Sequence, residues 1–282
     1  MKFASFKIGN TASWGLVQGD DIADLGALLA ERYPDLKSAI SAGALGEAAE
    51  AASKAKRHAL KDILFLPVIP NPDKILCIGL NYEMHRKETG RSEVENPTVF
   101  GRFANSQTGH LTNIIRPRVS TDLDFEGELA VVIGKAGRHI KPADAWDHVA
   151  GYACYNEGSV RDFQRHTHQF TPGKNFPATG AFGPWMVTRD EIEDLGSLRL
   201  QTRLNGQVVQ DTTIDQMIFD IPRQIEYCSS FTRLEPGDVI ATGTPGGVGS
   251  RRNPPLWMKP GDTVEVEIER IGLLRNGIAD EA

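Results

Sequence analysis

Short apolar runs separated by turn residues recur along the chain, and this pattern predicts a protein built mainly from strands. Near the N-terminus, Lys2–Ile8 and Trp14–Val17 are expected to form short strands around a Gly9-Asn10 turn. Two longer stretches, Ile22–Ile40 and Leu45–Leu60, are rich in Ala and Leu with charges interspersed, so we expect helices there.

A proline-rich segment, Leu66–Pro72, separates this first part from the rest of the chain. We therefore expect a small N-terminal domain over residues 1–70 and a larger domain over residues 71–282. In the larger domain, apolar runs and turn residues predict strands at Lys74–Ile78, Glu126–Ile133, Gly183–Thr188, Val239–Ala241 and Val264–Ile268, and a hairpin over Leu198–Gln210 around Asn205-Gly206.

One amphipathic helix interrupts the strands, at Asp215–Phe231. It carries an apolar stripe at helical spacing, formed by Met217, Ile221, Ile225 and Cys228, which we interpret as core packing. Many short strands and few helices favour a mixed α+β fold, mainly β, with a β-roll or barrel-like body and a small N-terminal domain.

Composition and charge narrow the class of protein. The 282 residues, 40% hydrophobic and 24% charged, are typical of an ordinary globular protein, and a net charge of −6 argues against nucleic-acid binding. No apolar run approaches the roughly 20 residues of a membrane span, and the first residues lack the apolar core of a secretory signal. Cys77, Cys154 and Cys228 form no Cys-x-x-Cys pair, so we expect buried, unpaired thiols and a reducing, cytoplasmic location.

The first chemically informative stretch runs from Asp124 to Ile133 and ends in an apolar run. If the strand begins near Asp124, Glu126 and Glu128 point to the same face, because side chains alternate along a strand. Two carboxylates that close repel each other unless a cation lies between them. The alternative is a solvated strand edge.

Two further stretches carry charge beside apolar segments. Asn156–Gln164 follows the apolar Val149–Tyr155, as a loop or short helix at the end of a strand would, and it suggests a cleft. Its alternative is a capped helix start with an internal ion pair. Lys174 lies between turn residues in a mostly apolar neighbourhood, and its alternative is an ordinary surface lysine.

His85 and Glu88 are three residues apart, so on a helical turn they are neighbours. A carboxylate beside an imidazole raises its basicity and orients it, as a general base requires, although an exposed surface pair would look the same. The glycine-rich Ala241–Gly249 lets the backbone approach an anion closely, or forms a plain tight turn. It lacks the Gly-Lys-Ser/Thr ending of a nucleotide-binding loop.

The segment Arg161–Phe170 is rich in Arg and His, which suggests a second carboxylate on a substrate or simply a solvated surface. His166 and His168 have no third nitrogen or sulfur ligand at useful spacing, so zinc is disfavoured.

In order and spacing, these segments together resemble the fumarylacetoacetate hydrolase family across nearly all of residues 74–270. The matching motifs are Gly79-x-Asn81-Tyr82-x-x-His85-x-x-Glu88, Glu126-x-Glu128, Asn156-Glu157-x-Ser159-x-Arg161-Asp162-x-Gln164, Lys174 with Phe176, and Thr242-Gly243-Thr244-Pro245-x-Gly247-Val248-Gly249. Residues 1–70 resemble the family's smaller N-terminal domain only loosely.

The resemblance implies sheets rolled into a barrel-like body, usually assembled as a homodimer. It also implies a Mg²⁺ or Mn²⁺ ion held by Glu126, Glu128 and Glu157, and all-oxygen ligation suits such hard cations. The third ligand is commonly Asp in the family, whereas this chain has Glu157, followed by Gly158 in place of a larger residue.

The implied activity is metal-dependent hydrolysis of a carbon–carbon bond in a small 2-oxo acid of the acylpyruvate type. In this hypothesis Glu88 polarises His85, which takes a proton from water, and Lys174 with Gln164 stabilises the oxyanion. Arg161 and Thr244 would hold the anionic ends of the substrate.

Three alternatives stay open at this point. Cleavage by the hydrolase would expel an enolate stabilised by the metal. An enolate stabilised in the same way would also serve a 2-oxo acid decarboxylase acting on an oxaloacetate-like acid, or an isomerase of the 2-hydroxymuconate type. The pair His85 and Glu88 favours the hydrolase, because it can activate water. A relative without catalysis is the third alternative, and failure to bind a divalent metal would favour it.

Overall fold

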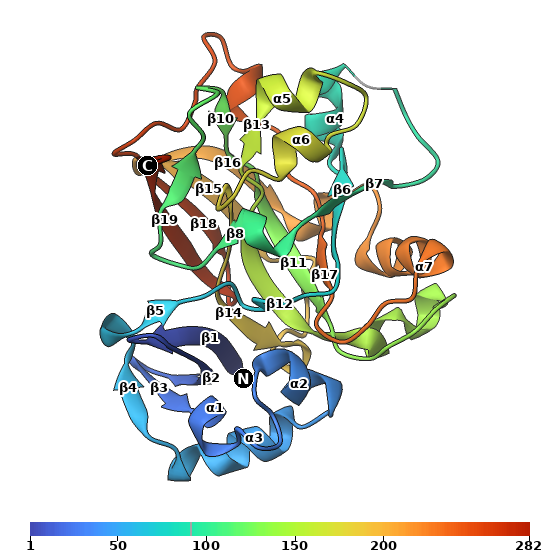
Figure 1. Ribbon diagram of the computed structural model, residues 1–282. Helices are drawn as coiled ribbons and strands as arrows, with labels where there is room; N and C mark the ends of the chain where they lie inside the picture. The colour runs from blue at the N-terminus through green and yellow to red at the C-terminus, as the bar shows by residue number, and fades with distance from the viewer. Residues whose placement is uncertain (91) are drawn as a thin grey trace.

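The computed structural model describes residues 1–90 and 92–282, and it is a mixed α+β structure dominated by strands, as the pattern predicts (Figure 1). The N-terminal part contains strands β1 (Lys2–Ile8), β2 (Thr11–Gln18), β3 (Asp21–Asp24), β4 (Arg57–Ala59) and β5 (Leu64–Phe65), with helices α1 (Leu25–Leu28), α2 (Leu36–Ser41) and α3 (Leu45–Ala51).

The two helices predicted in this part are wrong in extent. Ile22 pairs with Val17 between β2 and β3, and Asp24 then accepts a hydrogen bond from the backbone N–H of Ala27 to start α1. Asp35 begins α2 with a capping box, and Gly43, at φ +65°, lies between α2 and α3. These local stop signals divide stretches whose Ala and Leu content favours one continuous helix.

The remaining chain supplies most of the strands and the helices that carry the site. The strands are β6 (Ile75–Gly79), β7 (Thr98–Arg102), β8 (Gln107–Thr108), β9 (Ile114–Arg116), β10 (Leu123–Asp124), β11 (Gly127–Ile133), β12 (Val149–Asn156), β13 (Ser159–Val160), β14 (Gly180–Thr188), β15 (Arg199–Leu204), β16 (Gln207–Thr213), β17 (Val239–Ala241), β18 (Thr263–Ile268) and β19 (Gly272–Asp280). The helices are α4 (Glu83–Thr89), α5 (Arg161–Arg165), α6 (Thr171–Lys174) and α7 (Ile221–Phe231). Short 3₁₀ turns are η1 (Ala52–Lys54), η2 (Leu60–Asp62), η3 (Ala104–Ser106), η4 (Pro142–His148), η5 (Arg189–Glu191), η6 (Ile214–Gln216) and η7 (Gly249–Arg251).

One long sheet runs through the molecule in the order β4-β3-β2-β1-β14-β12-β11-β17-β6-β7, with β5 beside β1 and β8 beside β14. A second sheet has the order β16-β15-β18-β19-β9, and β10 pairs with β13. In the described residues neither sheet closes on itself, so the barrel-like body consists of open sheets.

The N-terminal strands join the body through β1, where Phe3 pairs with Met186 of β14. They also share its core, since Trp14 belongs to the same buried cluster as Ala130 and Tyr155. The division into a domain over residues 1–70 and another over 71–282 therefore stays a prediction.

Strand β19 was not predicted from the sequence, because Asn276-Gly277 within it resembles a turn. The structure places Asn276 inside the strand, where its buried amide donates to the carbonyls of Gly109 and Thr112. Helix α7 starts later than expected, because Asp220 caps it and Pro222 occupies its first turn. Ile221, Ile225 and Cys228 are core residues as predicted, whereas Met217 precedes the helix and packs against that core.

Helices α4, α5 and α6 gather at the end of the long sheet that lies far from the N-terminal strands (Figure 1). This clustering brings segments that are distant in sequence onto one edge of the sheet.

The three cysteines are buried and unpaired, as expected. In the described chain, no helix is long and apolar enough to cross a membrane.

Candidate metal centre and active site

Three buried glutamates meet at the adjoining ends of β11 and β12. Glu128 lies in β11, Glu126 directly precedes it, and Glu157 directly follows β12. The antiparallel register pairs Gly127 with Asn156, and the backbone N–H of Glu157 donates to the carbonyl of Glu126 over 2.8 Å. One carboxylate oxygen from each glutamate lies within 4.8 Å of the others. The predicted ligand set is therefore assembled in space.

The cations of the protein are shared unevenly among the three glutamates: Arg161 and Lys174 pair with Glu126, whereas no described cation forms an ion pair with Glu128. Burial, followed by the charges of Glu157 and Glu126, raises the pKa of Glu128 well above its usual range. Burial also raises the pKa of Glu157, against the effect of Lys174. Burial acts in the same direction on Glu126, but Arg161 and Lys174 outweigh it and lower that pKa.

The cluster has the properties of a site for a hard divalent cation. Oxygen Oε1 of Glu157 is buried and accepts no hydrogen bond from the described residues, an arrangement that costs about 1–3 kcal/mol if nothing else binds it. Three converging carboxylates are the ligands that Mg²⁺ and Mn²⁺ prefer. The residues present thus fit the metal that the sequence motifs imply.

Lys174 is a buried residue of this cluster, not a surface lysine. It ends the short helix α6, where the sequence suggested only a turn, and its ammonium donates to Glu126 Oε2 at 2.5 Å and Glu157 Oε2 at 3.0 Å. Burial lowers the pKa of Lys174, but the two carboxylates outweigh burial and raise it. The nitrogen also lies 5.2 Å from the centre of the Phe100 ring. An ammonium has three donors, so one remains for a substrate.

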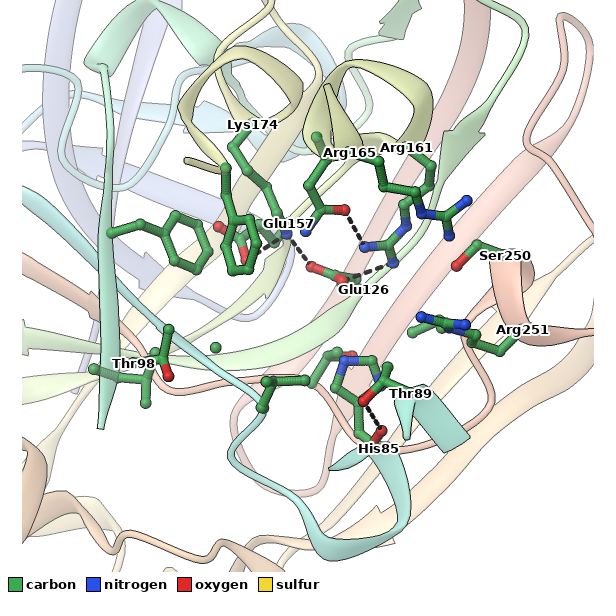
Figure 2. A pocket seen from close by; sticks show the side chains of 18 of the residues that line it. His85, Thr89, Thr98, Glu126, Glu157, Arg161, Arg165, Lys174, Ser250 and Arg251 are labelled. Atoms are coloured by element: carbon green, nitrogen blue, oxygen red, sulfur yellow. Dashed lines mark hydrogen bonds and ion pairs between the residues drawn. The ribbon is translucent and has the colours of Figure 1, made fainter. Parts of the chain in front are cut away.

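Arg161 holds the cluster from the other side (Figure 2). Its guanidinium donates to Asp124 Oδ2 at 2.8 Å, to Glu126 Oε1 at 2.7 Å and to Gln164 Oε1 at 2.8 Å. Because a guanidinium only donates, the oxygen of Gln164 must face it, and the amide nitrogen is left for the cavity. Arg161 is thus largely committed to the protein's own acceptors.

The pair His85 and Glu88 lies on α4, as predicted, with Nδ1 of His85 2.7 Å from Oε1 of Glu88. With Glu88 ionised, Nδ1 carries the hydrogen and Nε2 keeps a lone pair, the form that a general base needs. Figure 2 shows His85 facing Glu126 across the pocket, opposite Lys174. His85 and the three glutamates line one cavity of about 770 Å³.

The glycine-rich loop Thr242–Gly249 approaches anions, as expected, but these anions belong to the protein. The N–H of Gly243 donates to Glu128 at 2.8 Å, that of Gly247 to Glu88 at 2.9 Å, and that of Gly249 to Asp124 at 2.8 Å. Gly243 and Gly247 have φ of +104° and +101°, which favour glycine. One loop therefore orients three carboxylates of the site.

Thr244 lines the cavity, but its hydroxyl already donates to the carbonyl of Gly127 and accepts from Gln210. Its predicted contact with substrate, like the roles of the other site residues, stays a prediction. The structure brings all nine predicted residues to one cavity or its immediate edge.

Two buried residues of the site were missed by sequence reasoning. Asp124 accepts from Arg161 and from the backbone N–H groups of Gly249 and Ser250. Arg102 donates to the carbonyl of Gly158 at 3.0 Å and lies 4.0 Å from Oε1 of Glu157. Asp124 stood next to the recognised carboxylates, whereas no local signal distinguishes Arg102 from a surface arginine.

Comparisons with known proteins agree with this arrangement. Residues 74–279 match the family model described as fumarylacetoacetate (FAA) hydrolase C-terminal. The chain is 42% identical over 219 residues to a Bos taurus protein named oxaloacetate tautomerase FAHD2A, mitochondrial, a match that covers 77% of this chain and 70% of the relative.

Solved structures resemble the whole chain. That of a fumarylacetoacetate hydrolase from psychrophilic Exiguobacterium antarcticum has a TM-score of 0.88 at 32% identity, with 100% of both chains covered. That of a maleylpyruvate hydrolase from Sphingobium sp. SYK-6, in complex with manganese(II) ion and pyruvate, has a TM-score of 0.83 at 28% identity, again with 100% of both chains covered.

Proposed function

The chain belongs to the fumarylacetoacetate hydrolase family, and from this premise we propose that it is a divalent-metal-dependent enzyme that hydrolyses a carbon–carbon bond in an acylpyruvate-like 2-oxo acid. The observation that carries the proposal is the His85–Glu88 pair in the same cavity as the three buried glutamates. The relative solved with manganese and pyruvate supports both the metal and the substrate class.

A Mg²⁺ or Mn²⁺ ion held by Glu126, Glu128 and Glu157 would act as a Lewis acid toward the carboxylate and 2-oxo oxygens of the substrate. The oxygen ligands suit both ions, and the relative solved with manganese favours Mn²⁺ as the first ion to test.

The chain's own residues supply the proton transfers and the oxyanion contacts. Glu88 holds Nδ1–H of His85, so Nε2 takes a proton from water, and the hydroxide attacks the carbonyl carbon distal to the carboxylate. Lys174 and the amide of Gln164 donate to the resulting oxyanion. Cleavage of the bond to C3 gives a carboxylic acid and the enolate of pyruvate, to which His85 returns its proton. A positioned base contributes about 10²–10⁴-fold to such a reaction.

A second candidate is the tautomerisation of oxaloacetate, favoured by the 42% identity to proteins named oxaloacetate tautomerase. In this reaction His85 would move a proton between C3 and the oxygen on C2, with no attack by water. Decarboxylation of a 3-oxo acid or isomerisation of an unsaturated 2-oxo acid would use the same stabilised enolate.

The deciding experiment compares acetylpyruvate and oxaloacetate in the presence of Mn²⁺, of Mg²⁺, or of EDTA. Hydrolysis predicts metal-dependent formation of pyruvate and acetate from acetylpyruvate. Tautomerisation predicts faster keto–enol exchange of oxaloacetate with no pyruvate formed, and decarboxylation predicts pyruvate from oxaloacetate. Failure to bind either ion would contradict the metal-dependent proposal itself.

We further propose that the chain assembles as a homodimer, as the family resemblance implies. Analytical ultracentrifugation should give the mass of two chains, and a sedimenting monomer would contradict it. The cytoplasmic location inferred from the unpaired cysteines stays a proposal, since several relatives, the Bos taurus protein among them, are named as mitochondrial.

A further inference from the structure

The cavity extends beyond the metal centre toward a rim at which the described charged side chains are arginines. Among the described residues that line it, the carboxylates are those of the three clustered glutamates. This rim contains Arg165, Ser250 and Arg251. Figure 2 shows Ser250 and Arg251 on the side of the pocket away from Thr98 and Lys174. This rim thus adds positive charge at a distance from the clustered glutamates, where the described lining has no carboxylate.

Arg165 and Arg251 differ from Arg161 in what they contact. Arg161 is buried and paired with Asp124 and Glu126. In the described chain, the guanidinium groups of Arg165 and Arg251 line the cavity without a hydrogen bond or ion pair to a protein acceptor, although the backbone N–H of Arg251 donates to Val248. Their guanidinium groups are therefore free to bind a ligand.

The backbone that carries these two arginines is held in place by the site itself. Arg165 ends α5 and lies one helical turn after Arg161, so both side chains leave the same face of the helix. Arg251 ends η7, whose first two residues, Gly249 and Ser250, donate their N–H groups to Asp124. Asp124 thus anchors both segments, through Arg161 on one side and η7 on the other.

The arginines also lie close enough to oppose one another's charge. Burial, followed by the charges of Arg161 and Arg251, lowers the pKa of Arg165. The carboxylates of Asp124 and Asp122 act in the opposite direction without outweighing these effects, so a bound anion would further stabilise the charged arginine.

We propose that Arg165 and Arg251 bind a second carboxylate of the substrate, so that the enzyme takes 2-oxo diacids in preference to 2-oxo monoacids. The inference rests on the proposed function, because it assumes that the first carboxylate and the 2-oxo group bind at the metal centre. Planar guanidinium groups suit a carboxylate and can bind it through two parallel hydrogen bonds.

The charge of the cavity lining and the volume of the cavity both agree with a dianionic ligand. Among the described residues, the cavity lining has three carboxylates and four cationic side chains of Lys and Arg, so a bound divalent ion leaves this lining net positive. A dianion neutralises this charge better than a monoanion of equal length. The volume of about 770 Å³ is far more than acetylpyruvate needs, which leaves room for a longer, doubly charged chain.

The test compares acids of equal chain length in the Mn²⁺-loaded protein by isothermal titration calorimetry. The pairs are 2-oxoglutarate with 2-oxopentanoate, and 2-oxoadipate with 2-oxohexanoate. We expect at least one diacid to bind tenfold more tightly than its matched monoacid, which is the scale of a charge-assisted hydrogen bond. R165Q and R251Q should each weaken diacid binding roughly tenfold while leaving the monoacid affinity unchanged.

An exposed arginine outside the cavity provides the matched control. R138Q removes one positive charge from the β11–η4 connection, so it reproduces the change in net charge without touching the rim, and it should preserve the preference for diacids. Unchanged monoacid affinity in R165Q and R251Q would show that their metal centre is intact.

The outcomes separate this inference from the proposed function. Equal affinity for diacid and monoacid, or a diacid preference that survives the double variant R165Q/R251Q, would overturn the inference alone. If none of the four acids binds the Mn²⁺-loaded protein, the proposed function fails and the inference fails with it.

Discussion

Glu157 shows how packing around one residue fixes the position of a metal ligand. The backbone at the neighbouring Gly158 lies so close to Thr179 that a Cβ there would be 1.8 Å from the Thr179 carbonyl oxygen. Arg102 donates to the carbonyl of Gly158 as well. This packing restrains the backbone beside Glu157, so we expect it to compensate poorly for a shorter side chain.

The variant Glu157→Asp should consequently weaken Mn²⁺ binding even though it keeps the carboxylate. We expect a loss of at least roughly tenfold in affinity, measured by calorimetry with the purified protein. Glu157→Gln is the matched control, because it keeps the length and removes the charge. An Asp variant that binds Mn²⁺ as tightly as the parent protein would contradict the restraint on this backbone, and a Gln variant that does so would show that Glu157 is not a ligand.

His85 is the residue on which the proposed hydrolysis depends most. His85→Ala should lower kcat by about 10²–10⁴-fold, because Nε2 is the base that activates water, while Mn²⁺ affinity stays unchanged. Glu88→Gln tests the orientation of the imidazole, since it keeps a side chain of the same size beside Nδ1. Turnover at the parent rate in the His85 variant would exclude this base assignment.

At the scale of elements, the loop Thr242–Gly249 connects the metal centre to helix α4. It follows the core strand β17 and donates N–H groups to Glu128 and to Glu88. A side chain at Gly247 would combine an unfavourable φ with a Cβ 2.4 Å from the carbonyl oxygen of Val209. The geometry of the loop therefore depends on glycine at this position.

Gly247→Ala should lose both stability and activity. Backbone strain alone costs about 1–3 kcal/mol, and displacement of the loop should also remove the hydrogen bond to Glu88. Gly206→Ala, in the β15–β16 turn, is the matched control, because Gly206 also has positive φ, at +79°, but a Cβ there would meet no atom within 4 Å. Urea unfolding and turnover should show a larger loss for Gly247→Ala on both measures. Equal effects of the two variants would contradict the loop's role.

At the scale of the whole molecule, His110 lies where three distant segments meet. Its ring packs edge-on against Phe65 of β5 with centroids 5.1 Å apart, and its Nδ1 accepts the backbone N–H of Arg275 in β19 at 3.0 Å. Burial, followed by the charge of Arg275, lowers the pKa of His110 to about 4. The folded protein therefore holds this imidazole neutral.

Stability should fall as the pH is lowered through the window between the two pKa values of His110. The unfolded chain has the ordinary pKa of about 6.5, so between pH 6.5 and 4 it binds a proton that the folded protein excludes. The contribution is fully present above pH 6.5, and about 2 kcal/mol is lost at pH 5. Urea unfolding at pH 7.5 and pH 5 measures it. His110→Gln keeps an acceptor and should reduce this pH dependence, and an unchanged slope would contradict the assignment.

The sequence by itself determined the elements whose signals are local. The strand Lys2–Ile8 and the hairpin around Asn205-Gly206 were predicted correctly, because alternation and turn chemistry operate within a few residues. His85 and Glu88 were recognised as a pair for the same reason, since their spacing of three residues is a property of any helix. The order of the motifs identified the family as well.

Only the tertiary structure decided what depends on partners far apart in the chain. Lys174 becomes a buried partner of Glu126, 48 residues away, and Asp124 receives the loop at Gly249, 125 residues away. The contrast between Arg161, paired twice, and Arg165, left free, has the same origin. Burial and charge neutralisation depend on which side chains the sheet brings together, and short-range patterns in the sequence do not contain that information.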